Sequence, residues 1–181
     1  MIRKTTWSIF ILFALGMFSC NPQPETQKTA QNENSRNAFL PPRPLEQPEQ
    51  RKRLTPLGSY RKGIVEVKNK HVRVYIADSP EKQQEGLMFV KPHELGQDEG
   101  MLFIFTDDTI RAFWMKNTEI PLDIAFLDKG GKIVRVYTMK PYDESSYSSD
   151  YPVRYALELH AGWLEKNSVK EGDTVKLVKI R

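Results

Sequence analysis

The sequence is poor in the residues that build disulfides and metal sites. Its 181 residues include one cysteine, Cys20, and three histidines, His71, His93 and His160, which are scattered along the chain. A single cysteine excludes an internal disulfide, and no Cys pair or His-x-x-x-His pair is present to hold zinc or haem. We therefore expect a domain stabilised by its hydrophobic core alone, with no metal and no cofactor.

The common catalytic motifs are also missing. The sequence contains no Gly-x-Ser-x-Gly, no P-loop and no dinucleotide-binding fingerprint, so it offers no evident nucleophile. Three methionines, Met88, Met101 and Met115, are compatible with a soft ion such as Cu(I). Methionine more often fills gaps in a core, and we expect that role here.

Long apolar runs are absent beyond the N-terminus. Arg3 and Lys4 precede an apolar run over residues 9–18, which is too short to span a bilayer permanently and is typical of a secretion signal. The following Met-Phe-Ser-Cys at 17–20 resembles the cleavage site of bacterial lipoproteins. This resemblance implies a signal peptide over 1–19, a lipid on Cys20 and a protein anchored in the cell envelope. An ordinary signal peptide and an uncleaved anchor are the alternatives.

Residues 20–57 predict a flexible tether. Seven of the twelve prolines fall in this segment among Gln, Asn, Glu and Arg, with few large apolar residues. Such a composition buries too little surface to offset the entropy of ordering the chain. Asn21 stands where an aspartate often retains lipoproteins in the inner membrane, so we expect the outer membrane.

Residues 58–181 predict one mainly β domain, a compact, distorted sandwich or barrel with two short helices. Short runs rich in Val, Ile, Phe and Tyr alternate with turn residues, as in all-β proteins. Helices are expected after Ser79-Pro80, ending near Gly86, and over 161–169. The predicted strands cover 64–67, 71–77, 101–105, 112–115, 122–127, 132–139, 154–160 and 174–180.

The charge of this domain argues against nucleic acid as a partner. Residues 58–181 contain 19 basic and 19 acidic residues, so the basic pI of about 9.1 comes from the signal and tether. A protein that reads nucleic acid is expected to carry a basic domain. We expect a monomer whose partners are the membrane and a polar ligand.

Several phrases of the domain resemble the DUF192 family, also called UPF0127. They are GLM at 86–88, EGMLFIF at 99–105, WMKNTEIPLDIAFLD at 114–128, ALELHAGW at 156–163 and VKEGDTVKL at 169–177. The resemblance covers residues 60–181 and implies a compact, mainly β fold with no established activity. In that family the position before Gly-Leu-Met is often basic, whereas this chain has Glu85.

The candidate site consists of polar residues embedded in the predicted strands. With two-residue periodicity, Asp123 lies on a largely apolar face, and a buried carboxylate needs a partner. If residues 118–121 form a four-residue connection, an antiparallel register sets Lys116 opposite Asp123 and Asn117 opposite Leu122. Lys116 and Asn117 therefore join the candidate ligand-binding residues. Glu158 and His160 share the reverse face of their strand, and Trp114 would supply an aromatic wall to one cleft.

Three functions fit this pattern. A cation, carboxylates and an aromatic surface suit a module that binds a glycan, a cell-wall fragment or an envelope partner. Asp123 and Glu158 could instead act as the acid and base of a hydrolase. In the third interpretation Lys116 and Asp123 are an ion pair, Asn117 shapes a turn, and the protein is purely structural.

Overall fold

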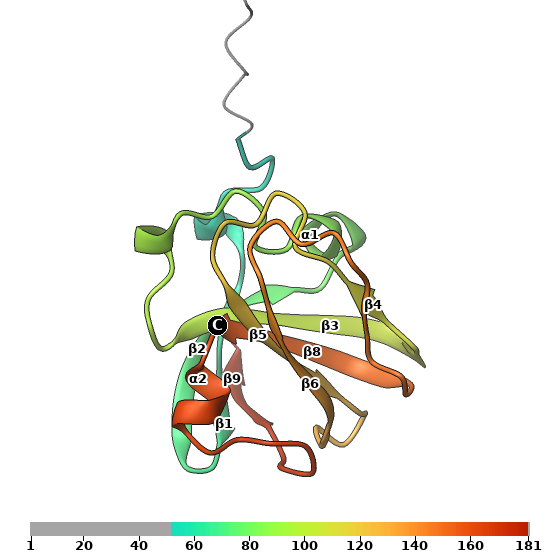
Figure 1. The fold of residues 1–181 in the computed structure, drawn as a ribbon. Helices are drawn as coiled ribbons and strands as arrows, with labels where there is room; N and C mark the ends of the chain where they lie inside the picture. Colours follow the sequence, from blue (N-terminus) through green and yellow to red (C-terminus); the bar gives the residue numbers. More distant parts are fainter. Residues whose placement is uncertain (1–51, 181) are drawn as a thin grey trace, which may run out of the picture. The chain divides into compact units, whose positions relative to one another are not determined.

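The computed structural model describes residues 52–180 (Figure 1). The predicted signal peptide, Cys20 and the predicted tether up to residue 51 lie outside the described residues. Within the described part, the chain forms nine strands, two short α-helices and two 3-10 turns, at Leu57–Ser59 and Pro92–Glu94. The bounds are β1 Lys62–Val67, β2 Lys70–Ala77, α1 Pro80–Glu85, β3 Glu99–Thr109, β4 Ala112–Phe113, β5 Leu122–Leu127, β6 Ile133–Met139, β7 Tyr147–Ser148, β8 Val153–His160, α2 Trp163–Lys166 and β9 Lys176–Ile180.

Seven of these strands form one mixed sheet in the order β6-β5-β8-β3-β2-β1-β9. All neighbours are antiparallel except β2 and β3, which are parallel and need a crossover connection, supplied by the segment that contains α1. β4 and β7 form a separate two-stranded ribbon. The fold is mainly β with two short helices, as predicted, and the sheet stays open rather than closing into a barrel.

All eight predicted strands have a counterpart in the structure, but the strand predicted over 112–115 is reduced to the two residues of β4. The strand that the sequence pattern did not predict is β7, because its two residues are too few to show a period. The predicted Asp128-Lys129-Gly130-Gly131 hairpin joins β5 to β6, and Asp128 Oδ1 accepts hydrogen bonds from the backbone N–H groups of Gly130 and Lys132. Gly131 has φ of 79°, and a Cβ there would lie 2.3 Å from Val175 O, so this turn requires glycine.

The sheet carries a hydrophobic core on each face, because alternate residues of a strand point in opposite directions. One core joins the β3, β5 and β8 side chains Phe103, Ile124 and Ala156 to Leu87 and Met115 from the segments outside the sheet. In Figure 1 α1 and the long loops lie on this upper side of the sheet. The second core contains Leu102, Ala125 and Leu157 from the same strands, together with Trp163 and Leu164 of α2.

Helix α1 begins and ends with the expected turn chemistry. Ser79 Oγ accepts a hydrogen bond from Lys82 N at the start of α1, Pro80 is the first helical residue, and Gly86 ends the helix with φ of 50°. α2 is shorter than the predicted 161–169. None of the helices in residues 52–180 combines the length and apolar composition needed to cross a bilayer.

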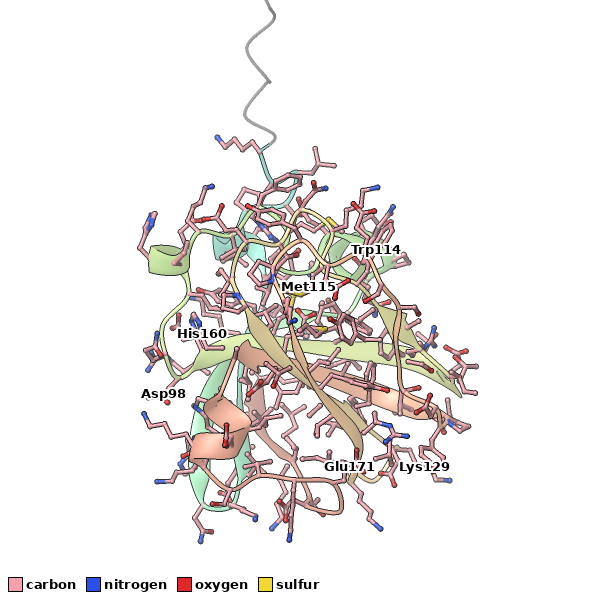
Figure 2. All side chains as sticks on the ribbon, in the orientation of Figure 1. Asp98, Trp114, Met115, Lys129, His160 and Glu171 are labelled. Atoms are coloured by element: carbon pink, nitrogen blue, oxygen red, sulfur yellow. The ribbon has the colours of Figure 1, made fainter. Side chains whose placement is uncertain are left out.

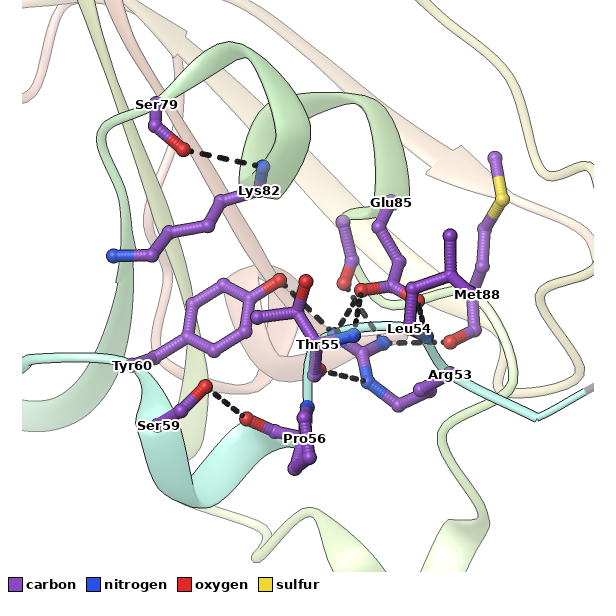
Figure 3. A network of polar contacts seen from close by, with 11 residues as sticks. Arg53, Leu54, Thr55, Pro56, Ser59, Tyr60, Ser79, Lys82, Glu85 and Met88 are labelled. Atoms are coloured by element: carbon purple, nitrogen blue, oxygen red, sulfur yellow. Dashed lines mark hydrogen bonds and ion pairs between the residues drawn. The ribbon is translucent and has the colours of Figure 1, made fainter.

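The described chain begins with a segment that is hydrogen-bonded to the end of α1 (Figure 3). We call these contacts of Arg53 and Glu85 the clasp. The Arg53 guanidinium donates to the carbonyl oxygens of Gly86 at 2.9 Å and Met88 at 2.6 Å, and to Tyr60 Oη at 3.1 Å. It also lies 3.7 Å from the Glu85 carboxylate, and its side chain is only 8% exposed. Ordered contacts with the domain therefore begin five residues before the predicted domain start at residue 58.

Glu85 completes this clasp from the helix side. Its two carboxylate oxygens accept hydrogen bonds from the backbone N–H groups of Leu54, at 2.6 Å, and Thr55, at 2.9 Å. The acidic residue that departs from the resembled family pattern is thus used to bind the N-terminal segment.

Arg53→Ala is expected to lower the free energy of unfolding by about 2 kcal/mol, since it removes several hydrogen bonds to partly buried carbonyl groups and leaves those groups unpaired. The measurement is urea denaturation of the purified protein, with Lys52→Ala, an exposed neighbour, as the matched control. Hydrogen exchange at the Leu54 and Thr55 amides should also become faster. Equal stabilities for the two variants would contradict the clasp.

Candidate functional site

Asp123 has a structural role in the sheet. It is 2% exposed; its Oδ1 accepts a hydrogen bond from Thr138 Oγ1 at 2.7 Å, and its Oδ2 accepts one from Leu164 N at 3.0 Å. Thr138 is its register partner on β6, and Leu164 is the second residue of α2. Both carboxylate oxygens therefore fasten neighbouring elements to β5.

The predicted pairing of Lys116 with Asp123 is wrong. The register partners of Asp123 are Thr138 and Leu159, whereas Lys116 lies in the loop between β4 and β5. The reason is the turn that follows β4: Asn117 is left-handed with φ of 55°, and Thr118 N donates to Met115 O at 3.1 Å. The chain therefore leaves β4 before it can pair with β5, although Asn117 shapes the bend as predicted.

Asp123 and Glu158 point to opposite faces of the sheet. Residues paired across adjacent strands point to the same face, and successive residues of a strand alternate. Glu158 pairs with Ile124 and Met101, whereas Asp123 pairs with Leu159. The two carboxylates that a hydrolase would need therefore do not converge.

His160 is also separated from the predicted aromatic wall. It shares a face of β8 with Glu158, as expected from the period, but its Nε2 lies 3.0 Å from Leu95 O. Figure 2 places His160 and Trp114 well apart on the domain. Of the six predicted site residues, Trp114 and Glu158 line one pocket, with Lys116 and Asn117 beside its rim, while Asp123 and His160 are not among its lining residues.

The pocket has a volume of about 310 Å³ and opens between α1, β3 and β4. This is near the lower end of the range of roughly 300–1,000 Å³ for small-molecule sites. Its lining residues are 83–88, Phe103, Phe105, 111–114, Thr118 and Glu158.

Aromatic rings form the walls of this pocket. Phe113 packs edge-to-face against Phe103, with ring centroids 4.9 Å apart, and against Phe105 at 6.5 Å. The Trp114 ring at the rim is 47% exposed. Gly86 admits the ring of Phe103, because a Cβ on Gly86 would lie 3.3 Å from that ring.

Two buried polar atoms of the pocket lack a hydrogen-bond partner among the described residues, Arg111 Nε and Glu158 Oε2, and Glu158 is the more deeply buried residue. Its side chain is 4% exposed, and its Oε2 has no hydrogen-bond partner among the described residues. Burial raises the pKa of Glu158 to about 8, with no contribution from a neighbouring charge. At neutral pH the carboxyl group is therefore mostly protonated and can donate a hydrogen bond.

Two cations lie at the rim of the pocket. The Arg111 guanidinium lies 4.3 Å from the centroid of Phe105 and is paired with Asp107, and the Lys116 ammonium lies 4.9 Å from the centroid of Trp114. Met101 is opposite Glu158, and Phe105 lies four residues further along β3. At about 3.3 Å per residue, Phe105 is therefore roughly 13 Å along β3 from the position opposite Glu158, and the Arg111 guanidinium lies over this Phe105 ring.

The loops around the pocket hold residues in a backbone conformation that is uncommon for side chains other than glycine. Phe89, Asn117 and Tyr142 have φ of 60°, 55° and 59°. Backbone hydrogen bonds join them across loops, from Phe89 N to Asn117 O at 2.8 Å and from Tyr142 N to Thr118 O at 3.1 Å. Such conformations cost of order 1–3 kcal/mol each and cluster at functional sites.

A second hollow, of about 230 Å³, lies over β1 and β2 and lacks these features. Its lining includes Lys62, Tyr75 and Arg73. The Arg73 side chain is 68% exposed and is already paired with Glu99 at 3.0 Å. This hollow has no buried polar group without a partner, so the pocket above Glu158 is the stronger candidate.

The sequence did not predict Phe103, Phe105, Phe113 or Arg111 as site residues. The period of two along β3 could have placed Phe103 and Phe105 on the same face as Met101. The contribution of α1 and β4 could not have been read in this way, because it depends on the path of loops rather than on a strand period.

Metal ligands do not gather anywhere in the described part of the chain. No three His, Cys, Asp or Glu side chains within residues 52–180 lie where they could hold an ion together. Met101 and Met115 are fully buried in the core on the pocket side of the sheet, which is the packing role expected for them. Met88, for which the same role was expected, is instead partly exposed and lines the pocket.

Comparison with known proteins finds a similar curated sequence and similar crystal structures. The chain is 33% identical over 108 residues to the UPF0127 protein PH1112 of Pyrococcus horikoshii, an alignment that covers 57% of this chain and 85% of that protein. Two crystal structures are similar. A candidate transcription regulator of Sinorhizobium meliloti matches with a TM-score of 0.63 and 33% identity over 66% of this chain and 95% of that one. A protein of unknown function from Novosphingobium aromaticivorans matches with a TM-score of 0.62 and 30% identity over 68% and 91%.

The model of the DUF192 family, whose members are described as uncharacterised, matches residues 63–177 and so includes the strands, the loops and the pocket. The chain belongs to the DUF192 (UPF0127) family.

Proposed function

We propose that the protein is an envelope binding module, anchored in a membrane by lipid on Cys20, whose β domain binds a polar ligand such as a glycan or cell-wall fragment in the pocket above Glu158. The observation that carries this proposal is the Glu158 carboxyl group, which is buried under aromatic rings with an unpaired oxygen. Buried polar groups in proteins are nearly always hydrogen-bonded, because leaving one unpaired costs about 1–3 kcal/mol. A ligand that pairs with Glu158 accounts for this cost.

The walls and the loops support the same conclusion. Aromatic surfaces with few polar groups are the usual composition of small-molecule sites. The exposed Trp114 ring offers a platform at the entrance, and the strained backbone at Phe89, Asn117 and Tyr142 holds the rim in one shape.

The hydrolase alternative loses its geometric basis. It required Asp123 and Glu158 to share an open cleft, yet they point to opposite faces and both oxygens of Asp123 are occupied by Thr138 and Leu164. The Sinorhizobium meliloti relative is described as a candidate transcription regulator. Binding of nucleic acid by this chain is not supported by charge, because residues 58–181 are neutral.

Binding is tested by adding a soluble muropeptide digest to the ¹⁵N-labelled protein and following the amide resonances. The largest shifts are expected at residues 86–88 and 112–118, which surround the pocket. Trp114→Ala should weaken binding at least tenfold, whereas Tyr151→Ala, a matched control at another exposed aromatic residue, should not. Absence of shifts, or shifts confined to other surfaces, would overturn the proposal.

Anchoring is tested separately by fractionation. The full chain should be recovered with the outer membrane, and Cys20→Ser should release it or leave it with an uncleaved signal in the inner membrane. Equal distributions of the two forms would contradict lipid attachment at Cys20.

A further inference from the structure

The chemistry around Glu158 restricts the ligand more narrowly than polarity alone. The carboxyl group has apolar neighbours across both strands, Ile124 on β5 and Met101 on β3, and each is fully buried. An ionised carboxylate in such surroundings needs a cation in contact, and a neutral acid does not. The neutral acid carries one O–H donor and looks for an acceptor.

The other charged groups around the pocket make contacts within the protein, although the buried Nε of Arg111 has no partner among the described residues. Arg111 is paired with Asp107, Glu85 is bound by Arg53 and two backbone amides, and Lys116 lies over Trp114. His160, on the same face of β8, is hydrogen-bonded to Leu95 O. The charges of Arg111 and Glu85, which line the site, are therefore balanced within the protein.

The rim disfavours a positively charged ligand. Lys116 and Arg111 already place cations over Trp114 and Phe105, the rings on which an ammonium group would otherwise stack. An ammonium ligand would meet their like charges and would also have to ionise Glu158 inside an apolar pocket. An uncharged acceptor meets neither cost.

The walls determine what must flank this acceptor. Phe103 and Phe113 form an edge-to-face pair beside Glu158, and Leu87 and Met88 add apolar surface. Gln83, Gln84 and Thr118 supply polar groups elsewhere in the lining. A group that joins a carbonyl oxygen to a methyl group fills such a space, with the methyl against the rings and the oxygen at the Glu158 O–H. The half-exposed Trp114 ring then lies where a sugar ring can stack on an aromatic face.

We propose that the pocket recognises the acetamido group of N-acetylated sugars, with the carbonyl oxygen accepting a hydrogen bond from Glu158 and the methyl group packing on Phe103 and Phe113. This inference rests on the proposed binding function and names the chemical class of its ligand. Glu158 is then a specificity-determining residue, since it separates acetamido sugars from amino sugars and plain hydroxyl sugars.

Three trisaccharides with the same β-1,4 backbone test this inference by isothermal titration of the full chain in detergent at pH 6. They are N,N′,N″-triacetylchitotriose (called chitotriose below), its de-N-acetylated form and cellotriose, which differ at the C2 substituent. Chitotriose should bind at least tenfold more tightly than the other two. Tighter binding of the amino form, or equal binding of all three, overturns the acetamido assignment while leaving a binding function in place. Binding of the muropeptide digest without binding of chitotriose has the same meaning, and binding of neither overturns both proposals.

Two variants at Glu158 test whether its hydrogen-bond donor, rather than its contribution to folding, determines binding. Glu158→Gln keeps a donor and should bind chitotriose within threefold of the wild type at pH 6, whereas Glu158→Ala should lose at least tenfold, with unchanged folding verified by the melting temperature. Wild-type affinity should fall above pH 8, where Glu158 loses its proton, and that of Glu158→Gln should not. Equal pH profiles for the two proteins would overturn the role of the Glu158 proton.

Discussion

Asp123→Ala is expected to lower the free energy of unfolding by about 4 kcal/mol, the largest loss from a single polar side chain of this domain. The substitution removes two hydrogen bonds to a buried carboxylate, each worth roughly 1.5–3 kcal/mol, and leaves Leu164 N without its partner. It also separates α2 from β5, so the packing of Trp163 and Leu164 should loosen. Urea denaturation at neutral pH measures the loss.

A double-mutant cycle identifies the partner. Thr138→Val removes one of the two bonds and should cost about 1–2 kcal/mol, and the double variant should cost clearly less than the sum of the single ones. Glu144→Ala, at an exposed carboxylate, is the control and should change stability by less than about 0.5 kcal/mol. Additive effects of Asp123→Ala and Thr138→Val would contradict the bond between them.

A substitution at Asp123 is expected to change the stability of the fold without changing its affinity for a ligand. Because Asp123 faces the α2 side of the sheet, Asp123→Asn should leave the affinity for muropeptides unchanged even though it destabilises the fold. This outcome distinguishes the structure from the cleft predicted from sequence, in which Asp123 would line the ligand site.

The strands could be predicted from the sequence because their signal is local. Two-residue alternation and the turn residues that follow it, such as Asp128 to Gly131, identify β5, β6 and the hairpin between them without knowledge of the rest of the chain. The same reasoning placed Asp123 inside and required a partner for it. It could not choose between Lys116 and Thr138, since that choice depends on where one turn ends.

The site could be predicted only in part, for the same physical reason. Trp114 and Glu158 lie 44 positions apart and line the same pocket because β8 inserts between β5 and β3. Sequence alternation does not encode this strand order. The left-handed backbone at Asn117 turns the chain so that the residues after β4 do not pair with β5. Where the sequence predicted a hairpin, the structure has a loop at the rim of the pocket. The clasp of Arg53 on Glu85 was missed because composition assigned Arg53 to the tether.

Glu158→Gln is expected to stabilise the protein in alkaline solution while leaving its stability near pH 5 close to that of the wild type. The folded-state pKa of Glu158 is raised by burial to about 8, from 4.5 for an ordinary glutamate. Between these pH values the folded protein holds a proton that the unfolded chain has released, so stability falls as the pH rises through this window. The full loss is present above pH 8 and is on the order of 5 kcal/mol, because the two pKa values differ by about 3.5 and a tenfold change in proton affinity corresponds to about 1.4 kcal/mol.

Glutamine reproduces the shape of the protonated carboxyl group and does not titrate, so the difference between the two proteins isolates Glu158 from all groups that the two proteins share. Urea denaturation at pH 5, 7 and 9 should give a difference near zero at pH 5 that grows at each step, whereas Glu144→Gln should give none at any pH. A constant difference would mean that Glu158 is ionised in the folded protein and has a partner. A growing difference would show that the chain retains an acidic group that weakens its own fold, which is the cost expected of a residue kept for a ligand rather than for stability.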